Sequence, residues 1–229
     1  MVLVRVELQT PRALLADVND FYAKRLGVDP AADGSGFAVG ISDLVFHGDA
    51  GTPFYHFALL VPGDRFDAAL AWARELVELL PGGDIDDVVF DFDSWSAHAV
   101  YFLDPAGNIV ELIAHHGLSE GGASGAFDPS ELLGVSEVGL VGDPIEIASG
   151  LERIGLRLWD GALLPGRLAF FGERGRTFIV TAAEHGWLPT DRPAKQHPVD
   201  VVIAGLPAGE VTASGHRIRS IGPVNFRAR

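Results

Sequence analysis

Histidines, carboxylates and a tyrosine are the candidate side chains for chemistry in this sequence, which contains no cysteine. The absence of cysteine excludes disulfides, thiolate zinc sites and thiol nucleophiles. Two segments stand out: the run Phe-Tyr-His-Phe-Ala centred on His56, and the segment that begins with Tyr101 and ends with Glu111. The second contains Asp-Pro-Ala-Gly-Asn at 104–108, a tight-turn composition in which Pro fixes φ while Gly and Asn tolerate positive φ. This turn folds one strand onto the next and so sets where Glu111 lies.

An internal repeat provides the elements that must position these side chains. A frame of polar, apolar, any and apolar residues, typical of a strand, occurs at 5–8, 56–59, 137–140 and 200–203. Helix-start signals follow three of the frames, at Thr10, Asp64 and Asp143, and an apolar helical face follows each signal. After the fourth frame, Gly-Leu-Pro-Ala-Gly at 205–209 leaves no room for a helix. The repeat unit is therefore strand, helix, then two or three strands, in roughly 50 to 60 residues.

Composition narrows the class of protein. The chain has 229 residues, 48% of them apolar, with 31 acidic and 17 basic side chains and a formal net charge of −14, as in a folded soluble protein. Binding to nucleic acid requires clustered Lys and Arg, so no nucleic-acid partner is expected. No signal peptide or membrane span is evident, so we expect a cytoplasmic protein without a membrane partner. A glycine-rich stretch predicts a linker at 117–130 between domains at 1–116 and 131–229.

The run around His56 and the 101–111 motif resemble the vicinal oxygen chelate superfamily, which includes glyoxalase I, the fosfomycin and bleomycin resistance proteins and extradiol ring-cleaving dioxygenases. The resemblance extends to the second half only through the repeat pattern. It implies an α+β fold of tandem βαβββ modules, in which two modules form one partly open cup around a metal and its substrate. We therefore expect two cups, one from residues 1–116 and a degenerate one from the second half.

Metal-dependent members of this superfamily use a His from the first strand of one module, a His from the first strand of the next, and a Glu from a final strand. His56 matches the second His and Glu111 matches the Glu, but the first slot holds Arg5, which cannot ligate a metal. Glu7 shares the strand face of Arg5, ~6.6 Å further along. The expected ligands of Fe, Mn or Zn are thus His56, Glu111 and Glu7. The alternative is that Arg5 forms a salt bridge with Glu7 or Glu111 in place of the metal.

Tyr101 is expected to act with Glu111 in catalysis, because its hydroxyl could contact substrate or relay a proton. If Tyr101 faces the cup, His98 points to the opposite strand face, and a hydrogen-bonded structural role is expected for it. Only a bulge would turn His98 inward. His115 is expected at an exposed strand end.

The second half offers fewer candidate ligands. Its first-strand slots hold Glu137 and Asp200, and Ile179 aligns with Glu111, so no metal is expected there. Its long segment 184–198 leaves alternatives open: a lid over the first cup, an interface, or a packed connector.

Functions of different classes fit these residues. The first is a metal-dependent glyoxalase-like or dioxygenase-like enzyme that binds a small substrate with vicinal oxygens in the first cup. The second is a metal-free protein that sequesters a small ligand, as bleomycin resistance proteins do; in a third, both cups serve only assembly. The retained His56 and Glu111 favour the enzyme, whereas the acidic charge attracts cationic ligands and metals alike. We expect a monomer or homodimer.

Overall fold

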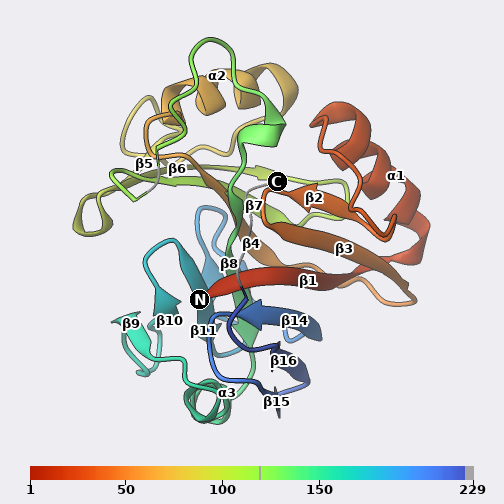
Figure 1. The fold of residues 1–229 in the computed structure, drawn as a ribbon, viewed down its shortest axis with the longest axis vertical. Coiled ribbons are helices and arrows are strands. Elements are labelled where there is room, and N and C mark those ends of the chain that lie inside the picture. The colour runs from red at the N-terminus through yellow and green to blue at the C-terminus, as the bar shows by residue number, and fades with distance from the viewer. Residues whose placement is uncertain (119, 225–229) are drawn as a thin grey trace.

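Two curved sheets form the molecule in the computed structural model, which describes residues 1–118 and 120–224 (Figure 1). The six-stranded sheet contains, from edge to edge, β15 (Gly209–Ala213), β16 (His216–Ser220), β14 (Val199–Ala204), β1 (Val2–Pro11), β3 (Ser42–Asp49) and β2 (Phe37–Val39). The eight-stranded sheet contains β5 (Phe90–Phe92), β6 (Ala97–Leu103), β7 (Ile109–His115), β4 (His56–Val61), β8 (Gly134–Val141), β11 (Arg176–Thr181), β10 (Ala169–Glu173) and β9 (Leu158–Gly161). A separate short hairpin consists of β12 (Gly186–Trp187) and β13 (Arg192–Pro193).

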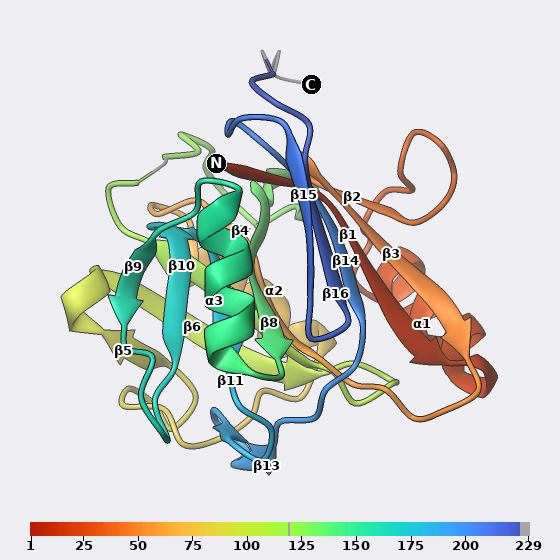
Figure 2. The same cartoon turned by 90° about the horizontal axis from the view of Figure 1, so that it is seen from below.

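Each sheet combines strands from both halves of the chain. The antiparallel pair β1 and β14 joins the first repeat unit to the fourth, and the antiparallel pair β4 and β8 joins the second to the third. Figure 2 shows the red N-terminal strand β1 beside the blue C-terminal strand β14. The α+β class with tandem modules, one of them degenerate, is confirmed. The prediction that each half forms its own cup is wrong, because β1 pairs with β14 and β4 pairs with β8. The strand patterns could not show this, since any strand edge can offer the same backbone hydrogen bonds to any other.

Helices cover the outer faces of the sheets. They are α1 (Leu15–Asp20), α2 (Phe66–Leu76) and α3 (Pro144–Arg153); 3-10 turns lie at Arg12–Leu14, Asp93–Trp95 and Pro129–Glu131, and a π-helical turn lies at Phe21–Arg25. Helix α1 packs on β3, α2 on β7, and α3 between β11 and β15 (Figure 2). In residues 1–118 and 120–224, none of the helices has the length and apolar character needed to cross a membrane.

The predicted helix signals have different roles in the structure. Asp143 caps α3, because its Oδ1 accepts the backbone N–H of Ile145 at 2.9 Å. Asp64 instead accepts the N–H groups of Gly121 and Gly122, at 2.8 and 3.1 Å, and so ties the glycine-rich segment to the start of α2. No side-chain cap precedes the first helical turn, so the signal at Thr10 is not used. As predicted, β14 leads to β15 without a helix.

Strand alternation divides the buried side chains into two clusters. On β7, Val110 and Leu112 belong to the larger cluster, which packs against the helices, whereas Ile109 and Ile113 belong to a second cluster on the inner face of the eight-stranded sheet. Glu111 lies between Ile109 and Ile113 on this inner face. The second cluster therefore surrounds a carboxylate.

Candidate active site

A row of paired residues crosses five strands of the eight-stranded sheet. Tyr101 on β6 pairs with Glu111 on β7, which pairs with Ala58 on β4. On its other side, Ala58 pairs with Glu137 on β8, which pairs with Thr177 on β11. Because paired residues share a face and neighbouring strands lie ~4.8 Å apart, two carboxylate-bearing backbones flank Ala58 at roughly 10 Å from each other. The small Ala58 side chain leaves the space between them open.

His56 lies on the same face, two residues before Ala58, and is 5% exposed. Its Nδ1 is 3.1 Å from the carbonyl oxygen of Ile109, and since a carbonyl only accepts, Nδ1 carries the hydrogen and donates. Its Nε2 is 3.4 Å from Oε2 of Glu111. In a neutral imidazole the Nε2 lone pair then faces a carboxylate oxygen, and a proton or a metal cation between them would satisfy both atoms.

Glu137 contributes a second buried carboxyl group. It is 2% exposed, and its Oε1 has no hydrogen-bond partner among the described residues. Burial raises the pKa of Glu137 well above its usual value, and the nearby charge of Glu111 raises this pKa further. Without a cation, Glu137 therefore favours its protonated form.

A cavity of about 80 Å³ lies over these groups. Its walls are mainly aromatic and apolar, and its lining comprises His56, Phe92, Trp95, Tyr101, Glu111, Glu137, Leu168, Phe170, Ile179, Trp187 and Leu188. Burial raises the pKa of Tyr101 well above its usual value, and Glu111 adds to this effect, so the phenol keeps its proton.

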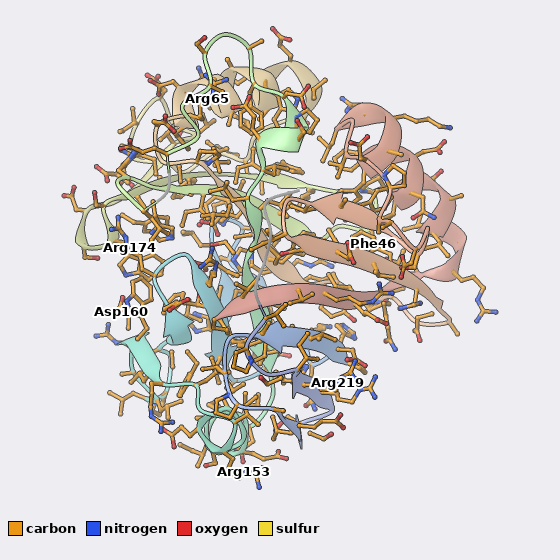
Figure 3. All side chains as sticks on the ribbon, in the orientation of Figure 1. Phe46, Arg65, Arg153, Asp160, Arg174 and Arg219 are labelled. Atoms are coloured by element: carbon orange, nitrogen blue, oxygen red, sulfur yellow. The ribbon has the colours of Figure 1, made fainter. Side chains whose placement is uncertain are left out.

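The two edges of the eight-stranded sheet approach each other and close the site from the side. Trp95 Nε1 donates to Asp160 on β9 at 2.6 Å, and the Trp95 ring packs edge-on against Phe170 at 4.7 Å between centroids. Arg174 donates to the carbonyl oxygens of Ser96 and His116 at 3.2 and 2.9 Å. Figure 3 shows Asp160 and Arg174 on the same side of the molecule.

The segment 184–198 packs over the cavity through Trp187, an arrangement that fits both the lid and the packed-connector alternatives. The ring of Trp187 lies 5.0 Å from the ring of His56 and is 3% exposed. Gly139 makes this contact possible, because a Cβ at that position would lie 2.9 Å from the Trp187 ring. Arg192 anchors the hairpin by donating to the carbonyl oxygen of Gly107 at 2.7 Å. The sequence pattern does not identify Trp187 as a site residue. The available signal is Gly139, which stands in the strand frame 137–140 and leaves room for a large side chain.

The predicted alignment of Ile179 with Glu111 is confirmed, but the equivalent positions of the second and third repeat units lie in one site. Ile179 pairs with Gly139 on β8 as Glu111 pairs with Ala58 on β4. Glu137 and Ile179 of the third unit therefore line the same cavity as His56 and Glu111 of the second. The expectation that Glu137 lies apart from the candidate metal site is wrong, because β4 pairs with β8.

Glu7 is not brought to this cavity. It lies in the six-stranded sheet, where Arg5 Nε donates to Oε1 at 2.6 Å and His47 Nε2 lies 2.7 Å from Oε2. Partial burial favours a higher pKa for Glu7, but the hydrogen bonds from Arg5 and His47 outweigh it and lower the pKa. The expected ligand set of Glu7 with His56 and Glu111 is therefore corrected: Arg5 pairs with Glu7, one of the partners that the salt-bridge alternative names, but in the other sheet and away from His56 and Glu111.

Two other histidines lie outside the cavity lining. His98 points to the opposite face, as strand parity predicts, and its Nδ1 is 2.7 Å from Nε2 of His116. His115 is only 1% exposed, so its expected exposed position is wrong. Its ring stacks on Trp95, and burial lowers its pKa to about 4.

The residue types of the cavity fit a divalent metal. The orientation of His56, with Nδ1 bonded to a carbonyl and Nε2 directed into the site, is the one that metal-binding histidines adopt. Glu111 faces it, and Glu137 adds a carboxylate with an unpartnered oxygen. In the described part of the chain, no three His, Asp or Glu side chains are already gathered tightly enough to hold a metal. The carboxylate of Glu137 would have to move toward the other two.

Comparison with known proteins gives the class of this fold. No protein-family model and no curated protein matches the sequence. A dioxygenase candidate from Bacillus subtilis subsp. subtilis str. 168 superimposes with a TM-score of 0.58 over 96% of this chain and 85% of that chain, at 15% identity. A glyoxalase I variant from Zea mays gives a TM-score of 0.53 over 96% and 93%, at 13% identity. The chain has the vicinal oxygen chelate fold.

Proposed function

We propose that this cavity is the active site of a metal-dependent enzyme of glyoxalase or dioxygenase type, acting on a small substrate with vicinal oxygens. The observation that carries the proposal is Nε2 of His56 facing Oε2 of Glu111 at 3.4 Å inside a buried aromatic cavity. With Glu137 beside them, the donor set is one imidazole and two carboxylates, which suits Fe, Mn or Zn.

Each residue has a role that its environment supports. His56, Glu111 and Glu137 would hold the metal, which when bound polarises substrate oxygens and stabilises negative charge on them. Tyr101 keeps its proton and can donate a hydrogen bond to a substrate oxygen. The buried Trp187 ring, which lines the cavity, excludes water from it. A cavity of about 80 Å³ holds only a few atoms, so substrate entry requires the Trp187 side chain to move.

Replacing Glu137 with glutamine is expected to weaken metal binding by about tenfold or more, because a neutral amide replaces a charged ligand. The measurement is calorimetric titration of chelator-stripped protein with Mn²⁺, Fe²⁺ and Zn²⁺. The matched control is Asp200→Asn, which changes the other first-strand acid of the second half; this acid pairs with Arg217 outside the cavity. Equal affinity in Glu137→Gln and wild type would remove Glu137 from the site. Wild type without saturable binding would contradict the metal proposal and favour ligand sequestering.

Metal binding should release a proton from Glu137. Its pKa in the folded, metal-free protein is raised, so a metal must displace the proton, and affinity should rise with pH. The stability of the metal-free protein has the opposite pH dependence: the contribution of Glu137 to it falls as pH rises. The neutral carboxyl stabilises the fold below the unfolded pKa of ~4.3, and this contribution is lost as pH rises through the higher folded pKa. Calorimetry in buffers of different ionisation enthalpy counts the released proton, and Glu137→Gln should release less; an unchanged count would contradict this assignment.

A further inference from the structure

A second and larger pocket lies behind the strand that forms one wall of the cavity. Its volume is about 570 Å³, and it opens between the start of α3, the turn from β9 to β10, and the segment after β11. Ile179 lines the cavity whereas Val180, the next residue on β11, lines this pocket, so the two hollows lie on opposite faces of the strand. Small-molecule sites in proteins typically enclose about 300 to 1,000 Å³. The pocket is therefore large enough for a whole ligand.

Its border is apolar and unusually exposed. Among the large apolar side chains in the described part of the chain, Ile145 and Leu164 are the most exposed, at 60% and 62%, and both line this pocket. Small side chains at Ala182 and Ala183 line it as well and leave its interior open. Clustered exposure of this kind marks binding surfaces, whereas isolated exposed apolar residues are common.

The walls are held by backbone hydrogen bonds, so the pocket is preformed. In the β9–β10 turn, the N–H of Ala162 donates to the carbonyl oxygen of Leu168 at 3.0 Å. In the opposite segment, the N–H of Glu184 donates to the carbonyl oxygen of Ala194 at 2.8 Å. The Asp143 cap fixes the third wall at the start of α3. A preformed pocket binds its ligand at a lower ordering cost.

Charge defines the kind of ligand. Arg167 lines the turn side of the pocket, is exposed, and its guanidinium makes no hydrogen bond or ion pair to another described residue. Glu184, on the segment after β11, disfavours a second acidic group. We propose that this pocket binds a small amphipathic molecule with an apolar body and a single acidic group that pairs with Arg167. This site is separate from the cavity at His56 and does not depend on its function.

Two fluorescent probes test the proposal on the full chain: 1-anilinonaphthalene-8-sulfonate, which is apolar with one acidic group, and the uncharged N-phenyl-1-naphthylamine. Both should show saturable fluorescence enhancement with one site. Ala183→Phe, which fills the pocket, and Leu164→Asp, which makes its border polar, should each weaken both probes by about tenfold. Arg167→Gln should weaken the sulfonate by about fivefold and leave the uncharged probe unchanged.

The matched control is Leu103→Asp, which alters an exposed leucine of β6 outside the pocket and should leave both affinities unchanged. Thermal melting followed by circular dichroism identifies any unfolded variant. If either Ala183→Phe or Leu164→Asp is unfolded, the other variant alone tests the site. Absence of saturable binding, or binding insensitive to both of these substitutions, would overturn the site. Equal loss of both probes in Arg167→Gln would overturn the pairing of an acidic group with Arg167.

Discussion

Replacing His56 with alanine is expected to abolish saturable binding of Mn²⁺, Fe²⁺ and Zn²⁺, a loss of about 100-fold or more. The substitution removes the nitrogen donor that faces Glu111 at 3.4 Å, and no other imidazole lines the cavity in the described part of the chain. The remaining donors are the carboxyl groups of Glu111 and Glu137, and Glu137 must give up its proton to bind a metal. Calorimetric titration of chelator-stripped protein measures the effect, with wild type and variant compared at one pH, because ligand protonation changes the apparent affinity.

His98→Ala is the matched control for this experiment. It removes a histidine of the same sheet that points to the opposite face and bonds to His116 at 2.7 Å. We expect a lower melting temperature from the lost hydrogen bond and an unchanged metal affinity. Loss of metal affinity in His98→Ala comparable to that in His56→Ala would show that the loss reports on folding and would contradict the assignment of His56.

Replacing Asn108 with alanine is expected to lower the free energy of unfolding by about 2 to 4 kcal/mol. Asn108 is fully buried, its Oδ1 accepts the backbone N–H of Tyr55 at 2.8 Å, and its Nδ2 donates to Asp104 at 2.7 Å. Alanine leaves that N–H without a partner and removes a donor from a buried carboxyl group. Urea denaturation gives the value.

Asn19→Ala, at an exposed position of α1, is the control and should stay within about 0.5 kcal/mol of wild type. Because Tyr55 directly precedes His56, the Asn108 variant should also bind metal more weakly. A stability close to that of wild type would show that water or a backbone shift replaces the lost bonds, and the turn would then not be what fixes the start of β4.

The local parts of the site could be predicted from the sequence. The strand frames place His56 on a first strand, and the turn at 104–108 brings Glu111 beside it because Pro, Gly and Asn restrict the backbone there. Strand parity places Tyr101 in the cavity and His98 outside it. These inferences rest on neighbours in sequence, whose geometry is set by short-range sterics.

The long-range parts could not be predicted in the same way. Four similar units can pair in several ways, and the hydrogen bonds that join β4 to β8 would look alike with any partner strand. The strand frames therefore identify Glu137 as a first-strand position but place it in the wrong cup, and they place Glu7 in a site from which the pairing of β1 with β14 removes it. Trp187 reaches the site from a segment whose course depends on that assembly.

The nested pairing of the units has a consequence for how the chain folds. The eight-stranded sheet uses residues 56–181, and its units are adjacent in sequence, so its contacts can form early. The six-stranded sheet joins β1 to β14, which are far apart in sequence, and this pairing must wait until residues 199–204 have left the ribosome. Closing so long a loop costs entropy and slows folding. We therefore expect a folding intermediate in which the metal-site sheet is formed while β1 and β14 are not yet paired with each other, and pulse-labelled hydrogen exchange would show β4 and β8 protected before the amides of β14 that bond to β1.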